Sequence, residues 1–86
     1  MGLPEILKKV RVEIGMTQVE IARSLNLSFS TVNRWENGRA RPNPLAAVTI
    51  LAFVKEKGAS QSSLEMLKAA LRDDKKSSEG GARGEG

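Results

Sequence analysis

Apolar residues recur at intervals of three and four along most of the chain, which is the spacing of one face of an α-helix. The first such face predicts a helix over residues 4–14. Pro4 suits its first turn, where a missing N–H has no helical partner to lose, and Gly15 ends it by accepting a left-handed backbone. The apolar face of this helix consists of Leu3, Ile6, Leu7, Val10 and Ile14.

A second, short helix is predicted to follow directly. Thr17 and Glu20 form a capping box, in which the hydroxyl and the carboxylate each satisfy a free backbone N–H. Asn26 fits the turn that ends this helix, since asparagine tolerates a positive φ angle better than most residues. The residues expected to face inward are Ile21, Ala22 and Leu25, with Leu27 beneath the turn.

A third helix is predicted from the cap residue Ser28 to about residue 37, and Gly38 ends it. Val32 and Trp35, three positions apart, are expected to point inward as core residues. The opposite edge then carries small, polar and cationic side chains. Two short helices joined by a tight turn form either a plain αα-hairpin or a DNA-binding helix-turn-helix.

Two further helices are predicted after a basic loop. Asn43 followed by Pro44 is a cap and a first-turn proline, so the fourth helix runs from there to about residue 57. It is apolar almost all round, which is typical of a helix buried on most sides or of one that also packs on a partner. Ser62 and Glu65 form a second capping box, which starts a fifth helix that ends near residue 72.

The composition changes after residue 72. The segment DDKKSSEGGARGEG is rich in glycine and charge and has no apolar residue larger than alanine. Such a segment buries too little surface to offset its ordering entropy, so residues 73–86 are expected to be a disordered tail. The fold predicted for residues 1–72 is therefore all-α, a compact domain of five helices.

Composition excludes several classes of function. The 86 residues include no cysteine and no histidine, so disulfides, the usual zinc ligand sets and catalysis by either residue are excluded. No cofactor is expected, and the chain is predicted not to be an enzyme. Two Phe and one Trp are too few for a platform that stacks single-stranded bases. The longest apolar run, residues 45–54, is too short to span a bilayer, so a soluble protein without membrane contact is expected.

The net charge of +4 permits binding to a polyanion. The segment MTQVEIARSLNLSFSTVNRWENGRARP resembles the phage repressor and Cro (XRE-like) type of helix-turn-helix family, through T-Q-x-E-[IL]-A, S-x-S-T-[VI]-x-x-W-E-N-G and the proline that follows. The resemblance extends from Ile6 to about Leu71. It implies a repressor-type DNA-binding domain whose third helix reads the major groove of double-stranded DNA. A transcriptional regulator that acts on a palindromic operator in the cytoplasm, at the nucleoid, is the expected function.

The outer and leading edges of the third helix hold the candidate base-reading residues. By bidentate geometry, Asn33 suits adenine and Arg34 suits guanine, although each can equally be ordinary helix surface. Phe29, where the family often has Gln, Ser or Arg, either packs on the second helix or touches a thymine methyl group. The full candidate set is Ser28, Phe29, Ser30, Asn33 and Arg34.

The resemblance also implies contacts outside the third helix. Gln18 is expected to donate to a phosphate, and Asn37 to the next phosphate, with Arg39 and Arg41 adding positive charge. An arginine late in the first helix often pairs with the glutamate of W-E-N-G in this family. Here the corresponding structural pair is Arg11 and Glu36.

One domain makes few base contacts, so a two-fold dimer is expected, with its reading helices about 34 Å apart on the DNA. The candidate contact surface is the apolar surplus of the fourth helix and the side of the fifth helix that carries Met66, Ala70 and Leu71. The alternative for the same residues is that they belong only to the core. Two alternatives stay open. One is an antitoxin or another protein-interaction module that also binds operator DNA, and the other is a DNA-targeting module of a larger protein.

Overall fold

A computed structural model describes residues 1–72, and within this part of the chain five helices and no strand are found. The helices are α1 (Leu3–Glu13), α2 (Gln18–Ser24), α3 (Phe29–Glu36), α4 (Pro44–Glu56) and α5 (Gln61–Arg72). The predicted all-α, five-helix fold is confirmed. The predicted disordered tail, residues 73–86, lies outside the described residues.

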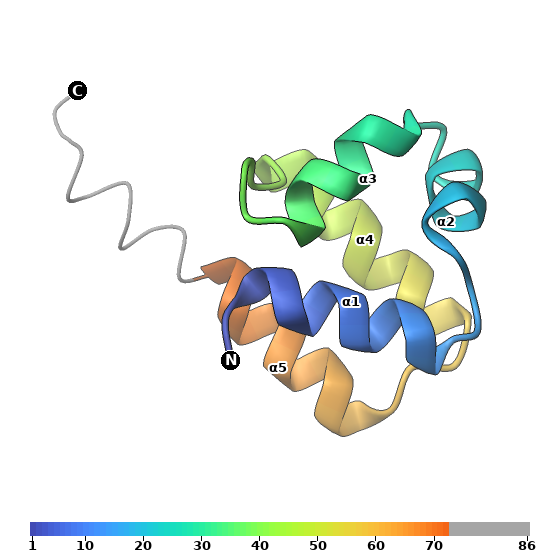
Figure 1. The fold of residues 1–86 in the computed structure, drawn as a ribbon. Coiled ribbons are helices and arrows are strands. Elements are labelled where there is room, and N and C mark those ends of the chain that lie inside the picture. Colours follow the sequence, from blue (N-terminus) through green and yellow to red (C-terminus); the bar gives the residue numbers. More distant parts are fainter. Residues whose placement is uncertain (73–86) are drawn as a thin grey trace, which may run out of the picture.

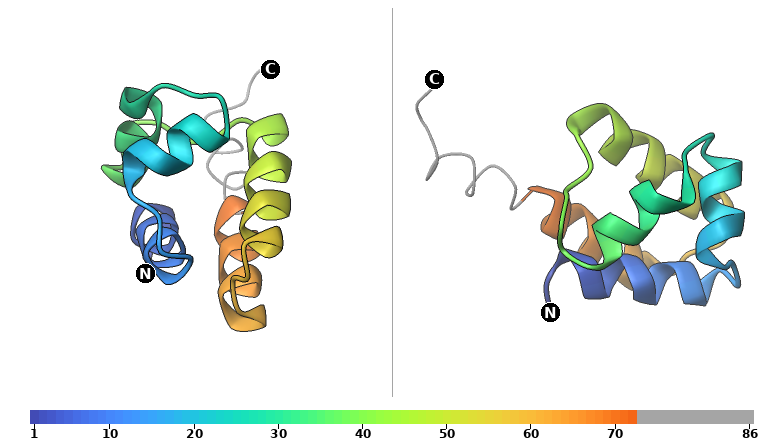
Figure 2. Two further views of the ribbon diagram at one scale, coloured as in Figure 1. Left: turned by 90° about the vertical axis from the view of Figure 1, so that its right-hand side faces the viewer. Right: turned by 45° about the horizontal axis from the view of Figure 1, so that its top comes forward.

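The helices pack in pairs. α2 packs against α3 and α4 against α5, while α1 touches both α3 and α5 and so joins the two pairs (Figure 1). The left view in Figure 2 shows α2 and α3 together on one side of the molecule and α4 and α5 on the other. None of the helices within residues 1–72 has the length and apolar character that crossing a bilayer requires.

A single core lies between the helices. Val10 of α1, Val54 of α4 and Leu67 of α5 are the most completely buried large side chains. Val32 and Trp35 are buried as predicted, so the tryptophan is a core residue and not a stacking surface. The buried apolar residues are Leu3, Ile6, Leu7, Val10, Ile21, Ala22, Val32, Trp35, Ile50, Val54, Leu67 and Ala70.

The turn between α2 and α3 depends on Asn26, which has a φ angle of 61°. The Leu27 N–H donates to the Ala22 carbonyl at 2.8 Å and the Asn26 N–H donates to the Arg23 carbonyl at 3.2 Å. This is the Schellman arrangement, which satisfies the last carbonyls of a helix around one left-handed residue. The prediction that asparagine fills this position is confirmed. The residue that caps α3 follows two positions after this turn residue.

The helix starts differ from the prediction at two places. α1 begins at Leu3, one residue early, and the carboxylate of Glu5 accepts the Gly2 N–H at 3.0 Å. The predicted cap of α5, Ser62, is wrong: the hydroxyl of Ser60 accepts the Ser63 N–H at 3.1 Å, and the helix begins at Gln61. The reason is tertiary, because Ser63 is buried and its hydroxyl hydrogen-bonds to Glu13 at the end of α1.

The end of α1 meets the start of α5 at Glu13. The Ser60 N–H donates to Oε2 of Glu13 at 3.3 Å. Hydrogen bonds from the hydroxyl of Ser63, and then from Ser60, lower the pKa of Glu13 below its ordinary value of 4.5. A lowered pKa means that the folded state favours the carboxylate, so the contact stabilises the fold above pH 4.5 and is lost as pH falls below that value.

Replacing Glu13 by Gln should therefore lower the melting temperature at neutral pH, where the wild-type carboxylate is charged. The difference between the two proteins should vanish at acidic pH, once the wild-type carboxyl is protonated in both states. Thermal unfolding followed by circular dichroism from pH 3 to pH 7 measures this. Glu65, an exposed carboxylate on the surface of α5, provides the control variant Glu65→Gln. A melting difference for Glu13→Gln that is the same at every pH would contradict the account.

Candidate nucleic-acid interface

The edge of α3 that faces away from the core carries the predicted base-reading residues. Ser28, Ser30 and Arg34 are exposed, whereas Val32 and Trp35 on the other side of the same helix are buried. This difference arises from the helical repeat, since the two buried residues are three positions apart and fix which side faces outward. The structure therefore gathers these polar and cationic side chains on one open surface.

Ser28 caps α3, as predicted. Its Oγ accepts the Thr31 N–H at 3.3 Å and shares a hydrogen bond with the Thr31 hydroxyl at 3.0 Å. The cap sets the first turn of α3 immediately after the Asn26 turn. Because Ser28 is nevertheless exposed, its position at the leading edge of the helix stays open to an approaching ligand.

Phe29 packs beside α2, which is one of the two roles considered for it, and it also stays partly exposed. Its side chain lines a hollow of about 290 Å³ together with α2 and the turn, yet 49 % of the residue is exposed. Val19 of α2, which the sequence pattern left unassigned, lines the same hollow and is 48 % exposed. Val19 lies three positions before Ala22 and so next to it on the surface of α2, and this spacing was the available signal. The leading edge of α3 therefore continues into a small apolar surface on α2.

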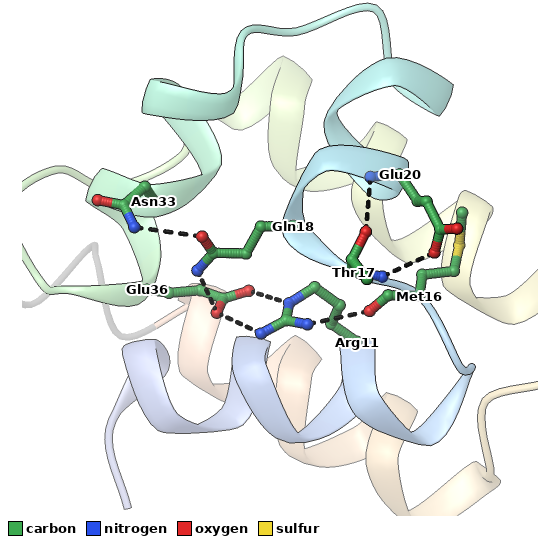
Figure 3. Close-up of polar contacts among 7 residues, drawn as sticks. All are labelled: Arg11, Met16, Thr17, Gln18, Glu20, Asn33 and Glu36. Atoms are coloured by element: carbon green, nitrogen blue, oxygen red, sulfur yellow. Dashed lines mark hydrogen bonds and ion pairs between the residues drawn. The ribbon is translucent and has the colours of Figure 1, made fainter.

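An ion pair connects α1 with the end of α3 (Figure 3). Arg11 donates from Nε to Oε2 of Glu36 at 2.7 Å and from Nη2 to Oε1 at 2.9 Å. Its Nη1 donates to the Met16 carbonyl at 2.9 Å, so one guanidinium also holds the segment between α1 and α2. The two side chains are only 12 % and 5 % exposed. The hydrogen bond to Glu36 raises the pKa of Arg11 above its ordinary value.

Three amide side chains extend from this ion pair toward the outer surface. Nε2 of Gln18 donates to Oε1 of Glu36 at 2.9 Å, and Nδ2 of Asn33 donates to Oε1 of Gln18 at 3.2 Å. Nδ2 of Asn37 in turn donates to Oδ1 of Asn33 at 3.0 Å. We call Glu36, Gln18, Asn33 and Asn37 the amide relay, and Figure 3 shows its first three members. Residues expected to contact DNA one by one are therefore joined to each other.

The two arginines of the loop after α3 have different surroundings. Arg39 is exposed, and its backbone N–H donates to the Arg34 carbonyl at 2.9 Å, so it directly follows the end of α3. Arg41 donates from Nη2 to the Ala70 carbonyl at 3.0 Å. The last carbonyls of a helix lack intrahelical partners, and Arg41 supplies one to α5. At least part of the role of Arg41 is thus structural, which the sequence did not indicate.

A comparison with protein families agrees with this geometry. A family model described as helix-turn-helix matches residues 7–55, which is more than half of the chain. No curated protein and no solved structure matches the chain significantly. The matched stretch begins in α1 and ends in α4, and so includes the ion pair, the amide relay and the outer edge of α3.

Proposed function

The chain belongs to the helix-turn-helix family of DNA-binding regulators, of the Cro and XRE type, and we propose that it is a transcriptional repressor that recognises a specific sequence in double-stranded DNA. One observation carries the proposal. The outer edge of α3 presents exposed Ser30 and Arg34, while Val32 and Trp35 anchor the opposite edge in the core. A helix held in this way can enter a major groove about 12 Å wide with its side chains directed at base edges. The repressor would act in the cytoplasm, on the nucleoid.

Base reading is assigned to the side chains on α3. Arg34 suits the two acceptors of guanine and Asn33 suits the donor and acceptor of adenine. The exposed half of Phe29, next to Val19, offers an apolar surface for a thymine methyl group. Ser28 and Ser30 complete the set at the start of the helix.

Phosphate binding is assigned to residues on both sides of α3, where contacts fix the register of the helix on the duplex. Gln18 and Asn37 flank the helix, and Arg39 follows it in the loop. Gln18 keeps a second amide N–H in addition to the one that it donates to Glu36. Arg41, which also donates to the Ala70 carbonyl, is assigned to this set as well because it follows α3 in the same basic loop as Arg39.

Arg39 gives the cleanest test of the phosphate contacts, because Arg41 also holds α5. Replacing Arg39 by Ala should weaken binding to all duplexes by a similar factor and lower the slope of log affinity against log salt by about 1. Fluorescence anisotropy with several unrelated duplexes between low and moderate salt measures both effects.

Lys68→Ala is the matched control, because it removes one positive charge from an exposed position on α5 and so changes the net charge equally. The control should leave the salt slope at the wild-type value. If Arg39→Ala and wild type show the same slope of log affinity against log salt, Arg39 does not contact phosphate. Failure of the wild-type protein to bind any duplex would contradict the proposed function itself.

Dimerisation on DNA is the second part of the proposal. Leu45 and Val48 of α4 are 76 % and 65 % exposed, although α4 buries Ile50 and Val54. Leu45 also borders a groove of about 260 Å³ whose lining includes Leu25 and Trp35. Of the candidate residues on α5, Ala70 is buried in the core and does not face a partner. The contact surface is therefore proposed to centre on Leu45 and Val48.

Sedimentation of the protein with a palindromic duplex of its selected sequence should show two chains for each duplex. Val48→Glu should leave folding intact and shift the complex toward one chain for each duplex, because it places a charge in an apolar contact. A single chain bound by wild type under the same conditions would contradict the dimer. Two chains of wild type in the absence of DNA would be consistent with it.

The exposed Leu45 and Val48 also favour a second candidate, an antitoxin-like module that binds a protein partner through α4 and operator DNA through α3. A DNA-targeting module of a larger protein would use α3 in the same way. If α4 instead binds a partner protein, Val48→Glu should weaken that contact and leave the number of chains for each duplex unchanged, which distinguishes this use of α4 from the homodimer.

A further inference from the structure

We infer that Gln18 is a positioning residue for base recognition: together with Glu36 it fixes the orientation of the Asn33 amide, and so the hydrogen-bonding pattern that α3 presents to a base. The inference rests on the proposed function, because it concerns the same face of α3. It gives Gln18 a role in specificity in addition to a phosphate contact.

The orientation begins at Glu36, whose side chain is 5 % exposed. Both of its oxygens accept hydrogen bonds from Arg11. An ionised carboxylate only accepts hydrogen bonds, so a neighbouring amide must present its nitrogen to it. Gln18 does so, with Nε2 at 2.9 Å from Oε1 of Glu36. The opposite orientation of Gln18 would place two oxygens against each other.

The orientation of Gln18 then determines that of Asn33. Because the nitrogen of Gln18 bonds to Glu36, its Oε1 faces α3. An amide oxygen can only accept a hydrogen bond, so Asn33 must present its nitrogen, and Nδ2 of Asn33 lies 3.2 Å from Oε1 of Gln18. Oδ1 of Asn33 is thereby left for Nδ2 of Asn37, at 3.0 Å. Every donor in the amide relay therefore points toward Glu36, and one buried carboxylate sets the direction of three amides.

The relay leaves Asn33 able to read a base. A primary amide has two N–H donors and an oxygen with two lone pairs, and the relay uses one donor and one lone pair. One donor and one acceptor position remain, which is the number that a bidentate contact with N7 and N6 of adenine requires. Because the amide is already held, it presents one fixed pattern and loses little freedom on binding.

The variant that tests this is Gln18→Met, which keeps a side chain of similar length and cannot hold the amide of Asn33. It leaves the contacts between Arg11 and Glu36 in place. Gln61→Met is the matched control, since it makes the same substitution at an exposed position of α5 that has no part in the proposed interface. Selection of bound sequences from random duplex DNA, with the full chain, compares the three proteins.

Wild type and Gln61→Met should prefer the same base at every position. Gln18→Met should lose its preference at one position by about tenfold and keep the others. Weaker binding of Gln18→Met with every base preference unchanged would overturn the inference and leave Gln18 as a phosphate contact. Absence of any preference in wild type would overturn the proposed function, and this inference with it.

A measurement on the wild-type protein without DNA does not depend on how well the variant folds. In nuclear magnetic resonance spectra of the ¹⁵N-labelled protein, the side-chain amide of Asn33 should show slowed exchange of one proton with water, as expected for a donor held by Gln18. Exchange of both Asn33 protons at the rate of an exposed asparagine would overturn the inference.

Discussion

Replacing Glu36 by Ala should lower the free energy of unfolding by roughly 3–5 kcal/mol, which is the cost of leaving one member of a buried ion pair without its partner. The side chain of Arg11 is only 12 % exposed, so its charge would stay largely buried in the variant. It would lose the two hydrogen bonds that it donates to Glu36. The hydrogen bond from Nη1 of Arg11 to the Met16 carbonyl survives. Chemical denaturation followed by circular dichroism measures the difference.

This loss is large for a domain of this size, because small domains are stable by about 5–15 kcal/mol in total. Part of the Glu36→Ala protein should therefore be unfolded without denaturant at physiological temperature. Arg34→Ala is the control, since Arg34 is exposed on the same helix and its loss should leave stability nearly unchanged. An unfolding free energy of Glu36→Ala within about 1 kcal/mol of wild type would show that the ion pair does not hold α1 to α3.

Replacing Arg34 by Ala should weaken binding to the preferred duplex by roughly 1–3 kcal/mol and relax the choice of base at one position. The effect follows from the bidentate contact between a guanidinium and the O6 and N7 acceptors of guanine. Anisotropy titrations against the preferred duplex and against duplexes changed at single positions measure both parts of the effect.

Arg34→Lys separates charge from geometry. It keeps the positive charge but not the planar fork of donors, so it should retain much of the salt-dependent affinity and lose part of the discrimination. If Arg34→Ala instead weakens binding to every duplex by the same factor, Arg34 contacts phosphate and does not read a base.

The helix boundaries were largely predictable because they depend on local chemistry. Asn43 before Pro44, and Ser28 before α3, cap their helices as the sequence suggests. The start of α5 was not predictable in this way, because Ser60 and Ser62 are both acceptable caps. The choice depends on Ser63, which is buried and lies near Glu13, 50 positions earlier in the chain.

In the candidate site, too, the features set by local spacing were predictable and those set by the packing of helices were not. The exposed edge of α3 follows from helical spacing, since Val32 and Trp35 determine which side is buried. The contact of Gln18 with Asn33 depends instead on how α2 lies against α3, which no local pattern specifies. The bond from Arg41 to the Ala70 carbonyl joins residues 29 positions apart and is beyond local pattern in the same way.

The spacing within α3 did contain a partial signal for the amide relay. Asn33, Glu36 and Asn37 are three and four positions apart, so their side chains lie on one face of the helix. That spacing indicates that these side chains are neighbours, and it leaves Gln18 out. The structure adds the residue that connects Asn33 to Glu36.

The central claim is that this domain recognises a specific sequence in double-stranded DNA through α3. Selection of bound duplexes from a random pool by the wild-type protein tests it most directly. The account predicts one enriched motif, repeated as a palindrome with its halves about one duplex turn apart. A bound pool with the same sequence composition as the starting pool would contradict the account.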